Sequence, residues 1–137
     1  FEELQPSPSM MGRDAKEKAQ VEMWQRRVEL LGMLPAADAF RNTGKGWTDR
    51  AVPGPTNYAQ IPELAERGRT RVEHFLGVLN QQLEVSEFVA TETFTIADIT
   101  AFILIEFAGW SKIEIPEEYV ALRRWYQSTK ARPSVKA

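Results

Sequence analysis

The chain has 137 residues and a mass of 15.6 kDa, the usual size of one domain and enough to bury a hydrophobic core. Its 17 basic and 19 acidic residues give a net charge of -2, which offers no support for a dedicated nucleic-acid or anionic-membrane binder. The absence of cysteine excludes disulfides, thiolate metal ligands and a cysteine nucleophile, and one histidine cannot build a histidine-rich metal site. No apolar stretch approaches the roughly 20 residues that a membrane-spanning helix needs.

The first 12 residues are expected to lie outside the main fold. Residues 1–4 resemble the last turn of a helix that begins earlier, and residues 5–12 read as a linker because Pro6 and Pro8 forbid a regular helix there. We therefore expect residues 1–12 to be the end of a preceding domain and a linker, and residues 13–137 to form one helical domain.

The first strong helix signal begins at Asp14, and Glu17 follows it at the spacing of a capping box. Apolar residues then recur at helical spacing on one face: Val21, Trp24, Val28 and Leu31. Pro35 is expected to kink or end this helix, with residues 36–40 continuing as a bent second half.

Residues 42–62 contain repeated Gly and Pro and show no helical period, so a long connection is expected. Trp47 and Tyr58 are predicted to pin this connection to the body of the protein. A second long helix is predicted to start near Pro62, a favoured first-turn residue. Its apolar stripe comprises Leu64, Val72, Phe75, Leu76, Leu79 and Leu83.

The start of the next helix is strongly specified. Thr95 is the N-cap, Asp98 is its capping-box partner, and Phe94 and Ile99 have the spacing of a hydrophobic staple. Residues 96–108 are apolar nearly all round, which predicts a helix at the centre of a bundle.

Gly109 is expected to end that helix, and a last helix is predicted to begin at Pro116 and to stop before Pro133. No alternation typical of β-strands is present. The sequence therefore predicts an all-α bundle of four main helices plus shorter pieces.

Four segments of the chain form a recognisable set. Residues 95–98 read Thr-Ile-Ala-Asp, and residues 1–14 carry an aromatic-x-Glu, a Pro-containing linker and Gly-Arg-Asp. Residues 78–83 read Val-Leu-Asn-x-x-Leu, and residues 125–133 carry Trp-Tyr and, after five intervening residues, Arg-Pro. In this order they resemble the C-terminal helical domain of the soluble glutathione transferases, in which a Thr/Ser-Ile-Ala-Asp element starts the central helix. The resemblance covers essentially the whole chain.

The resemblance implies that glutathione binds to, and is activated by, an N-terminal thioredoxin-like domain carrying the catalytic Tyr, Ser or Cys. No catalytic residue is therefore expected in this chain, and the chain by itself is expected to be inactive. The parent protein would be a cytoplasmic detoxification enzyme. It would use glutathione, without a metal, to conjugate a hydrophobic electrophile or to reduce a disulfide or peroxide. It would be a homodimer formed partly by the two long helices, with no nucleic-acid or membrane partner.

The resemblance also suggests site residues. Ile-Pro-x-x-x-Glu-Arg at residues 61–67 matches a segment in bacterial members whose Arg contacts glutathione, which implies that role for Arg67. The alternative is a solvated helix face in which Arg67 pairs with Glu63. The wall of the hydrophobic-substrate pocket is implied for Leu30, Met33, Leu34 and Ala37, and plain core packing is the alternative.

Other conspicuous residues favour structural roles. Asp98 is interpreted as a helix cap rather than a catalytic carboxylate, and His74 as a surface or satisfied side chain. Thr91 and Glu92 stand where the family usually has Gly followed by an acidic residue, so a positive φ there would be strained. The alternative to an enzyme is a non-catalytic transferase-like module for protein–protein interaction.

Overall fold

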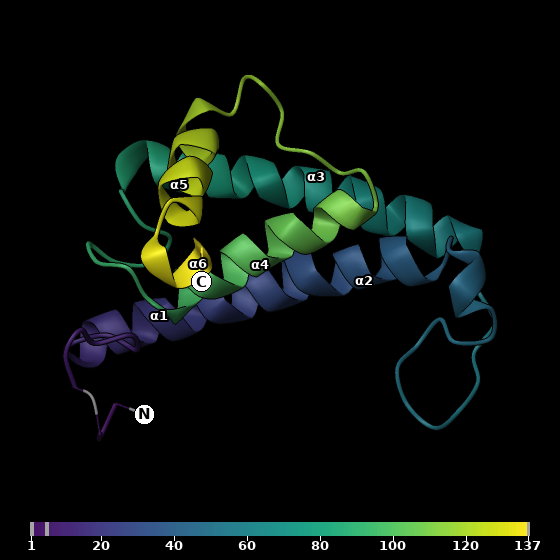
Figure 1. Cartoon of the computed structure of the whole chain (residues 1–137), viewed down its shortest axis with the longest axis horizontal. Helices are drawn as coiled ribbons and strands as arrows, with labels where there is room; N and C mark the ends of the chain where they lie inside the picture. Colours follow the sequence, from purple (N-terminus) through teal and green to yellow (C-terminus); the bar gives the residue numbers. More distant parts are fainter. Residues whose placement is uncertain (1, 5, 137) are drawn as a thin grey trace.

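The computed structural model describes residues 2–4 and 6–136, and these residues form an all-helical fold (Figure 1). The elements in chain order are α1 (Ala15–Arg27), a π-helical segment η1 (Val28–Met33), α2 (Leu34–Arg41), a short 3₁₀ segment η2 (Lys45–Trp47), α3 (Pro62–Val85), α4 (Ile96–Trp110), α5 (Val120–Lys130) and α6 (Pro133–Lys136). Because α1, η1 and α2 join into one long helix, the prediction of four main helices plus shorter pieces is confirmed.

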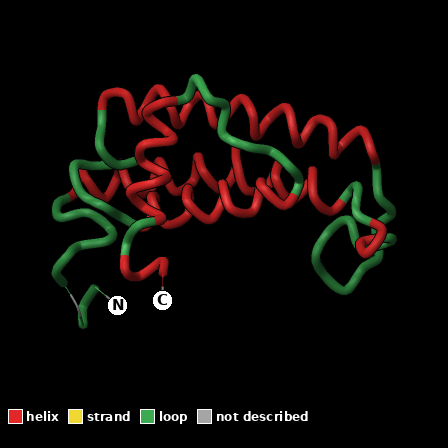
Figure 2. Tube along the Cα trace, turned by 45° about the horizontal axis from the view of Figure 1, so that its top comes forward, coloured by secondary structure: helices red, strands yellow, loops and turns green. Residues whose placement is uncertain are grey.

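The long helix α1–η1–α2 runs the length of the molecule, and the other helices pack around it. α3 returns beside α2, α4 lies along α1, η1 and α2, and α5 stands against α3 (Figure 1). The connection of residues 42–61 projects from one end of the bundle (Figure 2). The predicted apolar stripe of α3 lies in the core, except that Leu64 is only half-buried.

The segment before α1 is attached to the bundle. Glu2 accepts backbone hydrogen bonds from Met10 (2.5 Å) and Met11 (2.8 Å), and the carbonyl of Met10 accepts one from Ile96 at the start of α4 (3.0 Å). Residues 2–4 form a turn rather than a helix end. Phe1, which belongs to the predicted helix end, lies outside the described residues. The domain boundary near residue 12 stays a prediction.

The long helix passes Pro35 through the π-helical segment, which the sequence did not predict. A proline has no N–H and crowds the carbonyl four residues before it. In η1 the backbone N–H of Leu34 donates to the backbone carbonyl of Glu29, which lies one residue further back than the acceptor in an α-helix. By the same spacing, the carbonyl of Leu30 would accept a hydrogen bond from the backbone N–H of residue 35, which proline lacks. Arg71 of α3 supplies the missing donor, since its Nη2 lies 3.1 Å from the carbonyl oxygen of Leu30.

The π-helical segment also changes which residues face the core. Val21, Trp24 and Val28 are buried as predicted, but Leu31 is exposed and Gly32 takes its place inside. A Cβ on Gly32 would lie 2.3 Å from a methyl carbon of Leu104 in α4. Glycine therefore lets α4 approach the long helix closely at this point.

The ends of α4 and α5 differ from the prediction. α4 continues past Gly109 to Trp110 and ends in a Schellman motif, in which Ile113 donates to Ala108 (3.2 Å) and Lys112 to Gly109 (2.9 Å). The left-handed residue is Lys112, with φ of 57°, so the position that favours glycine holds a lysine.

α5 begins at Val120 rather than at Pro116, because residues 116–119 form a turn. Its free N-terminus is capped from another helix. Asn80 of α3 accepts a hydrogen bond from the backbone N–H of Leu122 at 3.1 Å. Pro133 opens the short helix α6 directly after α5.

Candidate functional site

The residues predicted to wall a hydrophobic pocket do not all lie on one face. Leu30 and Leu34 are 52% and 56% exposed, and Ala37 is partly exposed one turn further on. Their spacing of four and three residues places them on the same side of the helix. Met33 instead packs against the hydrophobic core. The structure therefore brings three of the four predicted wall residues together.

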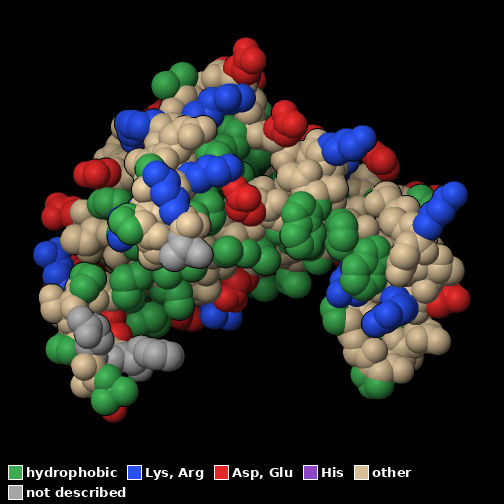
Figure 3. Space-filling model, in the orientation of Figure 1, with side chains coloured by type: hydrophobic (Ala, Val, Ile, Leu, Met, Phe, Trp, Pro, Cys, Tyr) green, Lys and Arg blue, Asp and Glu red, His purple; other side chains and the backbone are tan. Residues whose placement is uncertain are grey.

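α4 is not covered on all sides, which corrects the prediction of a fully central helix. Ile99 and Ile103 are exposed, and Trp110 is 71% exposed. α4 packs against η1 and α2, which carry Leu30, Leu34 and Ala37, so the two helices present exposed apolar side chains on adjoining elements. We name this surface the α2–α4 face; it comprises Leu30, Leu34, Ala37, Ile99, Ile103 and Trp110. Hydrophobic side chains gather over α1, α4 and α2 in Figure 3.

An aromatic cluster joins α2 to α4 at one end of this face. The ring of Phe40 lies 5.6 Å from Trp47, 5.5 Å from Phe107 and 5.8 Å from Trp110, measured between centroids. These separations are those of interacting aromatic pairs. Phe40, Phe107 and Trp110 were not predicted as site residues. Their position near the ends of predicted helices is the sequence feature that could have indicated them.

The connection of residues 42–61 is closed at its base by side chains. Asn42 accepts a hydrogen bond from the N–H of Ile61 (2.9 Å), and Gln60 donates to the carbonyls of Arg41 (2.7 Å) and Gly44 (2.8 Å). Trp47 packs on Phe40, which agrees with its predicted pinning role.

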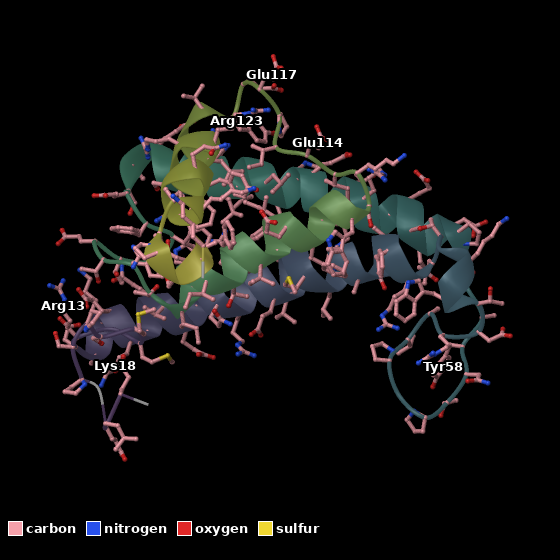
Figure 4. The ribbon with its side chains drawn as sticks, viewed as in Figure 1. Arg13, Lys18, Tyr58, Glu114, Glu117 and Arg123 are labelled. Carbon is pink, nitrogen blue, oxygen red and sulfur yellow. The ribbon has the colours of Figure 1, made fainter. Side chains whose placement is uncertain are left out.

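The prediction that Tyr58 also pins the connection to the body is wrong, because its side chain is half exposed at the projecting part of the connection (Figure 4). The backbone of Tyr58 holds the neck of the connection instead: its carbonyl accepts from the N–H of Ala51 (3.1 Å), and its N–H donates to the carbonyl of Asp49 (3.0 Å).

Asp98 is a fully buried carboxylate that joins three parts of the chain. It accepts hydrogen bonds from the backbone N–H of Thr95, from the backbone N–H of Val89 and from Nε1 of Trp125, each at 2.9 Å. Burial raises the pKa of the Asp98 carboxyl above its ordinary value, while these hydrogen bonds lower it. The carboxylate oxygens are thus occupied by structural donors, as the cap interpretation predicts.

The residues flanking this cap behave differently. Phe94 packs its ring on Phe88, 6.1 Å between centroids, and under the guanidinium of Arg132. Ile99 is exposed, so the staple between Phe94 and Ile99 stays a prediction. Thr91 has no positive φ, and its hydroxyl accepts from the N–H of Thr93 at 3.3 Å. The departure from the family's glycine therefore costs no backbone strain.

Arg67 lies exposed on α3. Within the described part of the chain its guanidinium makes no hydrogen bond or ion pair, so the alternative pairing with Glu63 is not formed. Its contact with glutathione stays a prediction. His74 is exposed too, and it borders a cavity of about 300 Å³ between η1 and α3.

Among residues 2–4 and 6–136, no group of three His, Cys, Asp or Glu side chains is placed to hold a metal ion. None of their helices combines the length and the apolar character needed to cross a bilayer.

Comparisons with known proteins agree with this geometry. The profile described as "Glutathione S-transferase, C-terminal domain" matches residues 47–133. "Glutathione S-transferase 2" of Saccharomyces cerevisiae is 32% identical over 134 residues, which are 97% of this chain and 55% of the yeast protein.

Two solved structures share both fold and sequence. The Gtt2-class glutathione S-transferase of Vibrio parahaemolyticus is 35% identical with a TM-score of 0.78, covering 94% of this chain and 57% of that chain. Gtt2 of Saccharomyces cerevisiae is 30% identical with a TM-score of 0.85, covering 97% of this chain and 62% of that chain.

The fold is therefore that of the C-terminal helical domain of glutathione S-transferases, and the chain belongs to this family. It is homologous to the Gtt2-class enzymes, and it corresponds to only the C-terminal part of these relatives.

Proposed function

We propose that this chain forms the second-substrate wall of a glutathione transferase. The observation that carries the proposal is the α2–α4 face, where six apolar side chains on two packed helices are exposed or partly exposed. Exposed apolar patches of this kind mark ligand or protein contacts. A hydrophobic electrophile would lie on this face, while glutathione conjugates to it or reduces a disulfide or peroxide.

The partner that completes the site is a thioredoxin-like domain of the same protein. The chain spans 55% and 57% of two of its relatives, which leaves room in such proteins for a further domain. The family resemblance implies that this domain would carry the thiolate-stabilising group. Part of the α2–α4 face would be covered by that domain, and the remainder would face the substrate. The chain alone is then expected to be folded but inactive.

A homodimer through the two long helices is the second part of the proposal. Leu31, Phe75 and Val78 line the cavity between η1 and α3, where Leu31 is turned outward by the π-helical segment. An apolar side chain from a second subunit would fit such a cavity. We place the assembled enzyme in the cytoplasm, with no membrane or nucleic-acid partner.

The test concerns Arg67 in the complete protein to which the chain belongs. If Arg67 binds a glutathione carboxylate, Arg67→Ala raises the KM for glutathione about ten- to a hundredfold, with a smaller change in kcat, because one charge-assisted hydrogen bond is lost. Arg67→Lys recovers part of the loss, since an ammonium cannot make a two-point contact. Lys16→Ala, which removes an exposed charge from α1, serves as the control.

Two results would contradict different parts of the proposal. A KM for glutathione within twofold of wild type would leave Arg67 as an ordinary surface charge with no role in glutathione binding. No glutathione-dependent turnover by the complete wild-type protein would favour the alternative, a non-catalytic module whose α2–α4 face binds another protein.

A further inference from the structure

The connection beside the α2–α4 face is positively charged. Residues 41–61, which we name the basic loop, contain three basic residues, Arg41, Lys45 and Arg50, and one acidic residue, Asp49. The chain as a whole carries a net charge of -2. No ion pair among the described residues involves Arg41 or Arg50, so both guanidinium groups are left without a carboxylate.

Both arginines gather around one indole ring. The Cζ atom of Arg41 lies 4.4 Å from the ring centroid of Trp47, and that of Arg50 lies 5.9 Å from it. Nη1 of Arg41 donates to the carbonyl of Arg50 at 3.1 Å, which leaves its other N–H groups unused. Cation–π contacts at these distances hold the guanidinium groups in place without neutralising them.

A cavity of about 140 Å³ adjoins both arginines. Its lining residues are Arg41, Arg50, Thr56 and Asn57, together with residues 52–54. A carboxylate or sulfonate group is only a few times the volume of a water molecule, so a cavity of this size accommodates it. Guanidinium groups bind such anions with strong, directed hydrogen bonds.

The basic loop is held in shape before any ligand arrives. Main-chain hydrogen bonds close its neck, from Tyr58 to Asp49 (3.0 Å) and from Ala51 to Tyr58 (3.1 Å). Asn42 and Gln60 close its base, as described above. A site that is ordered in advance loses less entropy on binding.

The basic loop continues the α2–α4 face. Leu34, Ala37 and Arg41 are spaced three and four residues apart in α2, so the apolar wall ends at a guanidinium on the same side of the helix. The ring of Phe40 bridges Trp47 of the loop to Trp110 of α4. A ligand lying along the apolar face therefore meets positive charge at this end.

We propose that the basic loop selects second substrates with an aromatic ring that carries a carboxylate or sulfonate. The ring lies on the apolar and aromatic side chains, and the anionic group enters the cavity that adjoins Arg41 and Arg50. This assignment of a substrate class rests on the proposed function. The binding preference itself can be measured without any catalysis.

The binding experiment compares 4-nitrobenzoate with its neutral isostere 4-nitrobenzamide in the complete protein. The indole N–H resonance of Trp47 reports occupancy of the site. We expect the benzoate to bind about tenfold more tightly, the effect of one charge-assisted hydrogen bond. Arg50→Gln removes this preference, and so does Arg41→Gln; the side chain of Arg50 makes no hydrogen bond with the other described residues, so its loss breaks none of them. Lys16→Gln, which lies on α1 away from the loop, preserves it.

The kinetic experiment compares 4-chloro-3,5-dinitrobenzoate with neutral 1-chloro-2,4-dinitrobenzene. The ratio of their kcat/KM values should fall about tenfold in Arg50→Gln and stay unchanged in Lys16→Gln. Equal affinity for the two nitrobenzene derivatives, or a preference that survives in both arginine variants, would overturn the inference. If the complete wild-type protein shows no glutathione-dependent turnover of any substrate but still prefers the benzoate, the proposed function fails and the anion site stands.

Discussion

The starts of α1 and α4 use the same sequence device and reach very different structures. At α1, Asp14 accepts the N–H of Glu17 at 2.9 Å, and Glu17 accepts the N–H of Arg13 at 2.8 Å and pairs with its guanidinium. These groups lie near the surface and within five residues of one another. At α4, the carboxylate of Asp98 is fully buried and binds groups as far away as Trp125.

The difference lies in what the donors could do without the carboxylate. An exposed N–H released from a cap finds water, whereas a buried one has no replacement and carries its full desolvation cost. The α1 cap is therefore a local adjustment of one helix. The Asp98 carboxylate is a junction that fixes the segment before α4, the start of α4 and α5 relative to one another.

The comparison is tested most strongly by Asp98→Ala. This change leaves the N–H groups of Thr95 and Val89 and the indole N–H of Trp125 buried without an acceptor. At about 1–3 kcal/mol for each unsatisfied donor, we expect a loss of about 3 kcal/mol or more. Urea unfolding followed by circular dichroism measures it. A loss below about 1 kcal/mol would show that Asp98 is only a local cap.

Asp98→Asn should cost less, about 1–3 kcal/mol. The amide oxygen can still accept from Val89 and Trp125, which share one carboxylate oxygen, but the amide NH₂ then faces the N–H of Thr95. The same unfolding assay, with activity of the complete protein as a second readout, checks this. Unchanged stability with abolished activity would contradict the junction and assign Asp98 a catalytic role.

Asp14→Ala is the matched change at α1, and we expect a loss of about 1 kcal/mol or less because water can replace the lost acceptor. Unfolding under the same conditions gives the direct ratio to Asp98→Ala. If the two losses are equal, burial does not distinguish the caps.

The sequence predicted the local capping residues of both helices, but it did not predict the hydrogen bonds that Asp98 makes with distant residues. Capping spacing is a property of four adjacent residues, so both helix starts were found, although Glu17 reaches Arg13 rather than Asp14. The contact from Trp125 to Asp98 spans 27 positions and depends on how α5 packs, which no local pattern encodes.

The same limit explains the other differences. Pro35 signals a break in the α-helical hydrogen bonds, but its repair by Arg71 depends on the position of α3. The apolar composition of α4 predicts burial on every side, but it does not show which element covers each side. In this chain the side chains of Ile103 and Trp110 are exposed. The α2–α4 face depends on how α4 packs beside the long helix, so no local pattern predicts it.

The smallest expected effect is the acid response of the α1 cap. The side chain and backbone N–H groups of Arg13 hydrogen-bond Glu17 and hold the pKa of its carboxyl at about 2, below the ordinary value of 4.5. A carboxyl whose pKa is lower in the folded state contributes stability above pH 4.5 and loses it as the pH falls toward 2. The pair is near the surface, so salt screens it and the contribution is small.

Thermal unfolding of wild type and Glu17→Gln at pH 6, 4, 3 and 2 isolates this contribution, because all other carboxyls titrate equally in both proteins. We expect wild type to be the more stable protein at pH 6 and the difference in Tm to vanish near pH 2. Raising the salt concentration at pH 6 should shrink the difference as well, since the ion pair with Arg13 is exposed to solvent. A Tm difference that is constant from pH 6 to pH 2 would mean that Glu17 acts through packing, and the charge of the α1 cap would then be irrelevant to its stability.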